Sequence, residues 1–319
     1  MSRLVVVGLG LTGDAVVRWA VDGGHDVVVV EDRPDALDAD RAAVARSHGV
    51  TVVATPTDPA AVADLLAGVD LCVPSPGVPE GHPFLAAARR AGVPVRSEVD
   101  LGAELLAARG RTLVAVTGTN GKTTVTELTV AMLEASGVPA VAAGNIGAPL
   151  LDEARRDRDH VVVAEVSSFQ LSAVTAAFAP RAAVITNVAA DHLDWHRTFD
   201  AYARAKAHVF AHQGPGDVLV FNADDPVVAA LAADAPGRTR AFSVNPDATA
   251  GFRTRDGAEG RMLVTADGEV LARVDALAAA APHDLANTLA AAALTLAAGG
   301  NPSGVATAAT AFVRGAHRL

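Results

Sequence analysis

Short apolar runs separated by helix-like segments recur along the chain. In the first hundred residues, the runs stand at 4–7, 27–31, 51–54, 71–73 and 93–96. A second series follows at 113–116, 139–143, 161–166, 182–186 and 218–221. Such alternation is typical of parallel sheets built from βαβ units. The pattern therefore predicts an α/β protein with two such domains in tandem.

Three further segments depart from this alternation. Residues 251–274 contain two Asp-Gly pairs, which predict antiparallel hairpins attached to the second domain. The charged segment 100–109 predicts a helix that bridges the two domains. The alanine-rich tract 277–298 is interrupted by Pro282 and by polar residues, so it predicts a buried helix and not a membrane span.

The sequence AVTGTNGKTT at 115–124 stands between an apolar run and a helix-like segment. This is the context of a phosphate-binding loop. Its glycines let the backbone approach phosphate oxygens, Lys122 supplies a cation, and the Thr123 hydroxyl can bind Mg²⁺. The spacing departs from the strict Walker pattern, whose first glycine would stand at Val116. The alternative is a glycine-rich turn with a chance lysine, and the strand-loop-helix context favours nucleoside triphosphate binding.

The first apolar run leads into Gly8-x-Gly10-x-x-Gly13, and Asp32 ends the second predicted strand nineteen residues after Gly13. This arrangement is typical of a dinucleotide-binding βαβ unit. Three interpretations are open: NAD with Asp32 on a ribose hydroxyl, another nucleotide diphosphate at the same helix N-terminus, or glycines that only permit close helix packing.

The sequence SPGVP at 75–79 follows the fourth apolar run. A rigid turn there places Ser75 and the Gly77 amide at the carboxyl edge of the sheet, where ligands bind in open α/β folds. An ordinary proline-stiffened loop is the alternative.

Three residues of the second domain have chemistry compatible with a metal site: Glu165 at a strand end, His192 after the next strand, and Lys206. A carboxylate and an imidazole at the ends of neighbouring strands can bind Mg²⁺ beside a triphosphate. Lys206 lies four residues after Tyr202, on the apolar stripe of the helix-like segment 199–210. It is either a snorkelling lysine or a desolvated one, with a lowered pKa, that can be chemically modified.

Two more segments carry polar residues next to predicted elements. Asn145, in GNIG at 144–147, is either a turn residue or a polar contact to substrate. Asp284 opens the alanine-rich helix and can act as its N-terminal cap, whereas Asn287 can reach a nucleotide.

Composition narrows the class of protein. The 319 residues, of which 50% are hydrophobic, suffice for about two domains with buried cores. A net charge of −10 disfavours a sequence-independent nucleic-acid binder. The single cysteine, Cys72, cannot form an internal disulfide and suits a reducing compartment, and the sequence has neither a secretory core nor a membrane span. We therefore expect a cytoplasmic protein that binds neither nucleic acid nor membrane.

In combination, these motifs resemble the Mur ligases of peptidoglycan synthesis along nearly the whole chain. The matching segments are GLGLTG at 8–13, ED at 31–32, SPGVP at 75–79, TGTNGKTT at 117–124, GNIG at 144–147, EVSSFQL at 165–171, TNVAADHLDWH at 186–196 and YARAKAHVF at 202–210. The resemblance is closest to the members that join D-glutamate to UDP-N-acetylmuramoyl-L-alanine. It implies ATP-dependent amide formation through an acyl phosphate, without a covalent enzyme intermediate, by a protein expected to be a monomer.

The resemblance also implies roles for individual residues. The catalytic residues implied are Lys122, Lys206, His192 and Asn145, with Lys206 as an N-carboxylated lysine. Two Mg²⁺ ions are implied, one on Thr123 and Glu165 and one on His192 and Lys206. The residues implied in ATP binding are Gly118, Thr119, Asn120, Gly121, Lys122, Thr123, Thr124 and Asn287. Those implied in binding the nucleotide sugar are Leu11, Thr12, Asp32, Ser75, Pro76, Gly77 and Asn145.

The expected domains follow from the same resemblance. They are a Rossmann-like UDP-sugar-binding domain at 1–109, a P-loop NTPase-like ATP-binding α/β domain at 110–313, and the beginning of a hinge at 314–319. Because the family has a third domain after that hinge, we expect this chain to be a fragment that binds nucleotide sugar but ligates poorly or not at all.

Two positions depart from the family pattern. Members commonly have His-Asn where this chain has His283-Asp284, which leaves the role of Asp284 open. Arg33 stands where a small polar residue often follows the aspartate, which leaves the contact to uracil open.

Four other functions are compatible with part of these motifs. An L-alanine-adding Mur ligase is the nearest alternative. A folylpolyglutamate-type ligase is disfavoured because more than 100 residues precede Gly118. A non-catalytic nucleotide sensor would give the set Glu165, His192 and Lys206 no task, and an NAD-linked oxidoreductase would leave the second domain unexplained.

Overall fold

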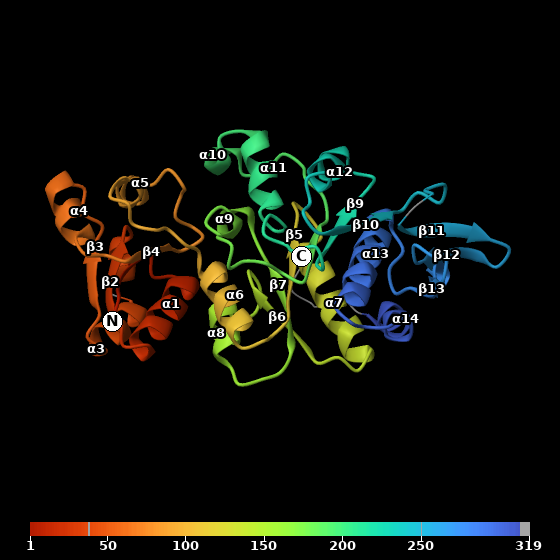
Figure 1. Ribbon diagram of the computed structural model, residues 1–319, viewed down its shortest axis with the longest axis horizontal. Coiled ribbons are helices and arrows are strands. Elements are labelled where there is room, and N and C mark those ends of the chain that lie inside the picture. Colours follow the sequence, from red (N-terminus) through yellow and green to blue (C-terminus); the bar gives the residue numbers. More distant parts are fainter. Residues whose placement is uncertain (38, 250, 313–319) are drawn as a thin grey trace.

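The structure, a computed structural model, describes residues 1–37, 39–249 and 251–312. Two sheets, each covered by helices on both faces, follow one another along the longest axis of the molecule (Figure 1). This arrangement confirms the predicted α/β class. The predicted hinge at 314–319 lies outside the described residues.

The first sheet has four parallel strands in the order β3-β2-β1-β4. The strands are β1 (Arg3–Val7), β2 (Asp26–Glu31), β3 (Thr51–Ala54) and β4 (Leu71–Pro74). The helices are α1 (Leu11–Asp22), α2 (Pro34–Leu37), α3 (Asp40–Ser47), α4 (Pro59–Leu66) and α5 (Pro83–Arg90). Val6 and Val29 pack with α1 and α3 on one face, whereas Val7 and Val30 pack with α4 and α5 on the other. Burial on both faces explains why these strands are continuous apolar runs.

The fifth strand predicted at 93–96 is wrong. Only Val95 forms an isolated bridge, to Cys72, through the bonds Cys72 N to Pro94 O and Arg96 N to Cys72 O. Pro94 has no N–H to donate, and the next helix begins at Glu98, so the segment is too short to continue a ladder.

The second sheet has nine strands in the order β13-β12-β11-β10-β9-β8-β5-β7-β6. The strands are β5 (Leu113–Thr117), β6 (Ala140–Gly144), β7 (Val161–Glu165), β8 (Ala182–Ile185), β9 (Val218–Asn222), β10 (Arg238–Ser243), β11 (Phe252–Gly257), β12 (Gly260–Val264) and β13 (Val270–Arg273). Neighbouring strands are parallel from β6 to β11, and β11, β12 and β13 pair antiparallel. The predicted hairpins are therefore confirmed, and Figure 1 shows them at the end of the sheet away from the first domain.

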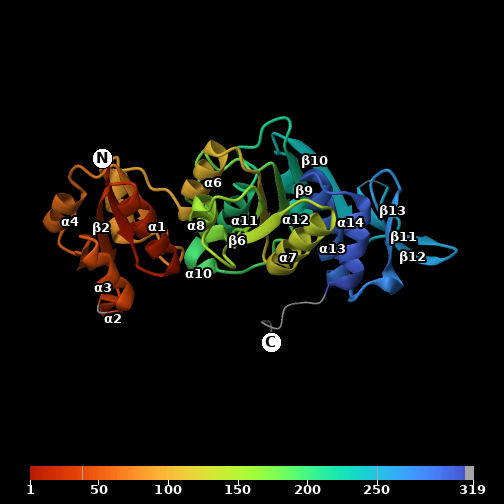
Figure 2. The same ribbon diagram turned by 90° about the horizontal axis from the view of Figure 1, so that it is seen from below.

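Helices cover both faces of the second sheet. They are α6 (Glu98–Ala108), α7 (Lys122–Ala135), α8 (Leu150–Arg155), α9 (Ser168–Leu171), α10 (Leu193–His196), α11 (Phe199–Ala207), α12 (Pro226–Ala232), α13 (Pro282–Ala297) and α14 (Pro302–Ala311), with a short 3₁₀ turn at Val274–Ala276. The alanine-rich tract forms the buried helix α13, which packs with α7 and α14 (Figure 2). In the described part of the chain, no helix is both long and apolar enough to cross a membrane.

Helix α6 contributes to the cores of both sheets. Leu101 packs in an apolar cluster of the first sheet, whereas Val99, Ala103 and Leu106 pack in a cluster of the second. The predicted bridging helix is present, and it begins two residues earlier than the predicted position 100.

Candidate functional site

The loop at 118–121 joins the central strand β5 to helix α7. Gly118 has a φ of 149° and Gly121 a φ of 83°, which side chains rarely tolerate. A Cβ on Gly118 would lie 1.9 Å from Thr186 Oγ1, and one on Gly121 would lie 2.3 Å from Asn287 Oδ1. Both positions thus require glycine, because the loop fits closely between the segment after β8 and helix α13.

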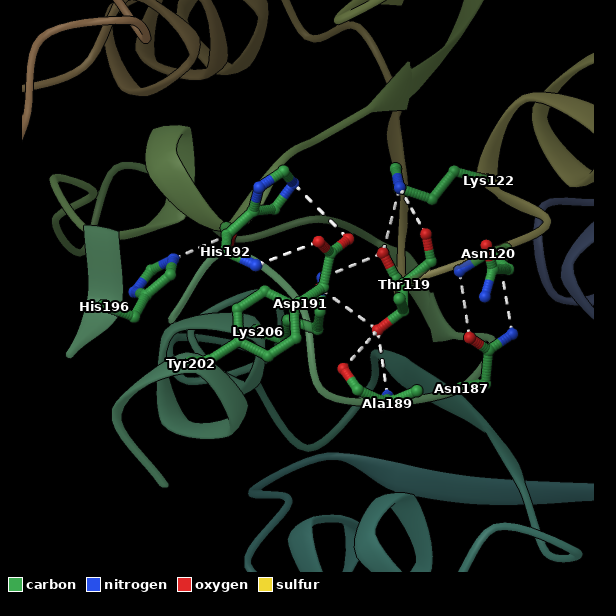
Figure 3. Close-up of polar contacts among 12 residues, drawn as sticks. Thr119, Asn120, Lys122, Asn187, Ala189, Asp191, His192, His196, Tyr202 and Lys206 are labelled. Carbon is green, nitrogen blue, oxygen red and sulfur yellow. Dashed lines mark hydrogen bonds and ion pairs between the residues drawn. The ribbon is translucent and has the colours of Figure 1, made fainter. Parts of the chain in front are cut away.

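Hydrogen bonds from the segment after β8 hold the same loop (Figure 3). The Asn120 N–H donates to Asn187 Oδ1 at 2.9 Å, and Asn187 Nδ2 donates back to the Asn120 carbonyl at 3.0 Å. Thr186 Oγ1 donates to that carbonyl at 2.6 Å. Sequence reasoning assigned neither Thr186 nor Asn187 to the site. Their position directly after β8, a neighbour of β5, was the available signal.

Three predicted site residues meet at the end of β7. Glu165 is only 2% exposed, and its Oε2 accepts a hydrogen bond from Thr123 Oγ1 at 2.6 Å. Its Oε1 accepts one from Asn145 Nδ2 at 2.8 Å. A carboxylate beside a hydroxyl at the start of α7 is an oxygen donor set that suits Mg²⁺. These residues therefore fit the first predicted ion.

Both predicted lysines lie against the phosphate loop. Lys122 Nζ donates to the carbonyls of Gly118 and Thr119, each at 3.0 Å, and Lys206 Nζ donates to the Gly118 carbonyl at 2.8 Å. Lys206 is 2% exposed, and its Nζ lies 4.4 Å from the centroid of the Tyr202 ring. Burial, together with the charge of Lys122, lowers the pKa of Lys206 to about 7. Lys206 is thus a desolvated lysine and does not snorkel.

Lys122 and Lys206 are also the two lysines of the sequence. Of the 26 cationic side chains, 24 are arginine and only Lys122 and Lys206 are lysine. Arginine cannot replace lysine where a compact amine must fit or react. The chain therefore keeps lysine only at the phosphate loop.

His192, the remaining predicted metal ligand, has an exposed side chain. Its backbone has a φ of 49°, its side chain is 48% exposed, and its Nε2 is 3.5 Å from Asp191 Oδ2. Its ring centroid is 6.4 Å from that of Tyr202, which also contacts Lys206. In the described ranges, no three His, Cys, Asp or Glu side chains form a metal-binding group. An amine is also a poor ligand for Mg²⁺, so the second predicted set fits an ion only with Lys206 carboxylated.

An imidazole–hydroxyl pair that sequence reasoning missed lies beside Lys206. The buried His196 Nε2 is 2.9 Å from Ser168 Oγ. Burial, together with the charges of the nearby Lys206 and His192, lowers the pKa of His196 to about 4. His196 therefore stays neutral at physiological pH. The sequence offered no signal because Ser168 and His196 lie 28 positions apart.

The other end of the loop borders a separate cavity. This cavity, of about 290 Å³, is lined by Thr124, Asp284, Thr288 and Phe312 among others. Asn287, on helix α13, packs against Gly121 of the loop. The N-terminal cap position of α13 is Ala281 and not Asp284 as predicted; Asp284 stands at the third position of the helix, and its Oδ2 accepts the Ala281 N–H at 3.3 Å.

The six residues that the resemblance places on the sugar-nucleotide part in the first domain line one cavity of about 560 Å³. They are Leu11, Thr12, Asp32, Ser75, Pro76 and Gly77. The Ser75 hydroxyl donates to the Gly8 carbonyl at 2.8 Å, which joins the SPGVP turn to the glycine-rich loop. The remaining sugar-site residue, Asn145, lies at the second sheet instead.

The acidic residue that ends the second strand is Glu31, and the prediction of Asp32 there is wrong. Glu31 Oε2 accepts the Leu9 N–H at 2.8 Å, and Arg33 Nε lies 3.2 Å from Glu31 Oε1. Burial alone would raise the pKa of Glu31, but hydrogen bonds from Arg33 and Leu9 keep it below its usual value. Asp32, one residue later, lines the cavity, and its Oδ2 is 3.0 Å from His82 Nε2.

Two family descriptions match the chain. "Mur ligase MurD-like, N-terminal domain" matches residues 2–97, and "Mur ligase middle domain" matches residues 116–295.

Curated relatives match along almost the whole chain. The chain is 41% identical over 322 residues to the UDP-N-acetylmuramoylalanine--D-glutamate ligase of Frankia casuarinae, and 40% identical over 328 residues to that of Thermobifida fusca. Each match covers 99% of this chain, and 65% and 68% of the two relatives respectively. The chain thus spans about two thirds of the length of these relatives.

Solved structures share the fold. The UDP-N-acetylmuramate:L-alanyl-gamma-D-glutamyl-meso-diaminopimelate ligase from Neisseria meningitides matches with a TM-score of 0.62 and 18% identity, over 98% of this chain and 99% of that one. The UDP-N-acetylmuramate-alanine ligase MurC from Thermotoga maritima matches with a TM-score of 0.54 and 21% identity, over 98% of this chain and 69% of that one. At these identities the likeness supports the fold alone.

Proposed function

This chain belongs to the Mur ligase family, and on that basis we propose that it serves ATP-dependent addition of D-glutamate to UDP-N-acetylmuramoyl-L-alanine in peptidoglycan precursor synthesis. A substrate carboxylate oxygen attacks the γ-phosphorus of ATP, the bond to the ADP oxygen breaks, and an acyl phosphate forms. The amine of D-glutamate then forms the amide bond, gives up a proton, and phosphate leaves.

ATP binds along the loop at 118–121, where backbone N–H groups at the start of α7 face its phosphates. Lys122 turns from the carbonyls of Gly118 and Thr119 to the transferring phosphoryl group and stabilises its developing charge. Thr119, Asn120 and Thr124 complete this contact surface. The cavity next to Asn287, of about 290 Å³, receives the nucleoside end.

The direct contact of Glu165 with both Thr123 and Asn145 beside the phosphate loop carries this proposal. Thr123 and Glu165 would hold one Mg²⁺. The Asn145 amide orients the Glu165 carboxylate, and it donates to substrate or nucleotide when one of them is bound. Bound Mg²⁺ supplies positive charge to the phosphate oxygens.

Lys206 is proposed to be N-carboxylated and to hold a second Mg²⁺ together with His192. Its amine nitrogen forms a bond to the carbon of CO₂ and releases a proton, which leaves a carbamate. Its burial and the restriction of lysine to two positions support this modification.

The nucleotide sugar binds in the cavity of the first domain, with its diphosphate at the N-terminus of α1. Leu11, Thr12, Asp32 and the turn at 75–77 contact the UDP part. We also propose a cytoplasmic location, with Cys72 as a buried thiol in a reducing compartment.

The substrate assignment is tested by calorimetric titration with UDP-N-acetylmuramoyl-L-alanine, with UDP-N-acetylmuramate and NADH as comparisons. We expect the alanyl compound to bind most tightly. Tighter binding of UDP-N-acetylmuramate would move the assignment to the L-alanine-adding ligases, and tighter binding of NADH would overturn it. A non-catalytic nucleotide sensor is distinguished by titrating Mg²⁺-ATP with and without the nucleotide sugar. In a sensor, the affinity for Mg²⁺-ATP should not depend on the sugar.

The proposed carbamate is tested by ¹³C NMR in ¹³C-bicarbonate. The wild-type chain should give a carbamate signal that persists in Lys122→Arg and is lost in Lys206→Arg. Because the chain has only two lysines, the N-terminal amine is the one other candidate, and blocking it by acetylation should leave the signal intact. A signal that survives Lys206→Arg would contradict the assignment.

A further inference from the structure

The side chain of His82 connects the two walls of the first-domain cavity. His82 is the N-terminal cap of α5, in the segment after β4, whereas Asp32 follows β2. Strand β1, with its glycine-rich loop, lies between β2 and β4. The contact of 3.0 Å between His82 Nε2 and Asp32 Oδ2 therefore joins the segments on either side of that loop.

The hydrogen bonds of His82 fix which ring nitrogen carries the proton. His82 Nδ1 accepts the Phe84 N–H at 3.3 Å, which requires a lone pair on Nδ1. In the neutral ring the proton is then on Nε2, and Nε2–H donates to the Asp32 carboxylate. The His82 side chain is only 12% exposed, against 51% for Asp32, so a largely buried ring holds a more exposed carboxylate.

Asp32 is the carboxylate left available at this end of the cavity. Glu31 is buried and already accepts hydrogen bonds from Leu9 and Arg33. Within the described residues, the Asp32 side chain makes its hydrogen bond or ion pair with His82. Asp32 also borders a second cavity of about 610 Å³ between α4 and α5, into which an unrestrained carboxylate can rotate.

We propose that His82 is a positioning residue for the nucleotide sugar. It holds Asp32 Oδ2, keeps the carboxylate toward the glycine-rich loop, and leaves Oδ1 to accept a hydrogen bond from an N–H or O–H group of the nucleoside. This inference rests on the proposed function, because it deepens the recognition of the same ligand.

The two hydrogen bonds of His82 can be removed separately. In His82→Asn, the amide oxygen replaces Nδ1 and keeps the cap of α5, but the side chain is too short to reach Asp32. In His82→Gln, the amide replaces Nε2 and can still donate to Asp32. Binding of UDP and of UDP-N-acetylmuramoyl-L-alanine is measured by calorimetry for both variants, for Asp32→Asn and for the double variant His82→Asn/Asp32→Asn.

We expect His82→Asn to weaken both ligands about tenfold, the loss of one hydrogen bond to a charged group. His82→Gln should restore most of the affinity, and the double variant should bind no more weakly than Asp32→Asn alone. Affinity for Mg²⁺-ATP should not change in His82→Asn.

Three results would overturn the inference: unchanged affinity in His82→Asn, additive losses in the double variant, or an equal loss of Mg²⁺-ATP binding. If the wild-type chain binds neither UDP compound, the proposed function itself fails, which separates the two outcomes.

Discussion

At the scale of single residues, burial sets the behaviour of the ionisable groups in this chain. Lys206 and Glu98 are 2% and 1% exposed, and burial shifts the pKa of each to about 7, from above and from below respectively. Lys206 borders the proposed ATP site. Glu98, at the start of α6, lies between α6 and α8 and is not part of a proposed site. Its Oε1 accepts the Leu151 N–H at 2.5 Å, and Asp152 adds a repulsive charge.

The raised pKa of Glu98 predicts a loss of stability as the pH rises. Below pH 4.5 the carboxyl is protonated in both the folded and the unfolded chain, so the full stability is present. Between pH 4.5 and about 7 the unfolded chain loses its proton while the folded chain keeps it, which favours unfolding. Above pH 7 the cost reaches roughly 3 kcal/mol.

Urea unfolding of wild type and Glu98→Gln at pH 5 and pH 8 measures this effect. The amide mimics the neutral acid, so the variant should gain stability over wild type at pH 8 and differ little at pH 5. Glu104→Gln, an exposed change on the same helix, is the matched control. The same difference between wild type and Glu98→Gln at both pH values would contradict the prediction.

At the scale of elements, the positions of strands were easier to predict from the sequence than the contacts between distant side chains. The valine-rich runs are buried on both faces, so their period and length identified every strand of the first sheet. The error at 93–96 arose because an apolar run does not reveal a missing donor at Pro94 in the ladder. Strand β10 was missed because three of its residues, Arg238, Thr239 and Arg240, are exposed and polar.

Site residues were predicted where a local motif marks them. Thr123, Glu165 and Asn145 come from separate motifs at strand ends, and the parallel order of β5, β7 and β6 brings them together. The pairing of Ser168 with His196, and that of Asp32 with His82, depends on packing between distant segments. No spacing in the sequence encodes such contacts.

One helix cap also holds the segment after β8. Asp225 Oδ1 accepts the N–H groups of Val227 and Val228 at the start of α12, and its Oδ2 accepts the Val188 N–H at 2.8 Å. Val188 directly follows Asn187, which holds the phosphate loop. Cap and loop are therefore coupled through a single carboxylate.

Substitutions at Asp225 should separate its cap of α12 from its contact with Val188. Asp225→Ala should destabilise the chain by about 1–3 kcal/mol through the lost cap and the unpaired Val188 N–H. Asp225→Asn keeps an oxygen for the cap but turns an amide toward Val188, so it should weaken Mg²⁺-ATP binding with a smaller loss of stability. Urea unfolding and calorimetry measure the two effects.

The matched control is Asp58→Ala, which removes the cap of α4, where Asp58 Oδ2 accepts the Ala61 N–H. It should lower stability and leave Mg²⁺-ATP binding unchanged. If Asp225→Asn binds Mg²⁺-ATP as wild type does, the contact with Val188 has no part in holding the loop.

At the scale of the whole molecule, two helices, α6 and α8, pack in apolar clusters of both sheets. The proposed sugar site lies on the first sheet and the proposed ATP site on the second. Leu101 of α6 and Leu151 of α8 pack at the first sheet, whereas Leu106 of α6 and Leu150 of α8 pack at the second. Arg18 on α1 also pairs with Asp152 on α8 at 2.8 Å, beside the buried Glu98. The structural link between the two sites therefore runs through α6, α1 and α8.

This arrangement predicts where each ligand slows hydrogen exchange. A ligand at a hundred times its Kd stabilises the segments that must open with its site by about 2.7 kcal/mol, which slows their exchange about a hundredfold. UDP-N-acetylmuramoyl-L-alanine should protect β1, β2 and β4, Mg²⁺-ATP should protect β5 and the start of α7, and either ligand should protect α6. Exchange measured by mass spectrometry tests this, with β12 and β13 as an internal control that neither ligand protects. Strong protection of the hairpins by the nucleotide sugar, or an α6 that responds to only one ligand, would mean that opening of the two sheets is not coupled through this helix.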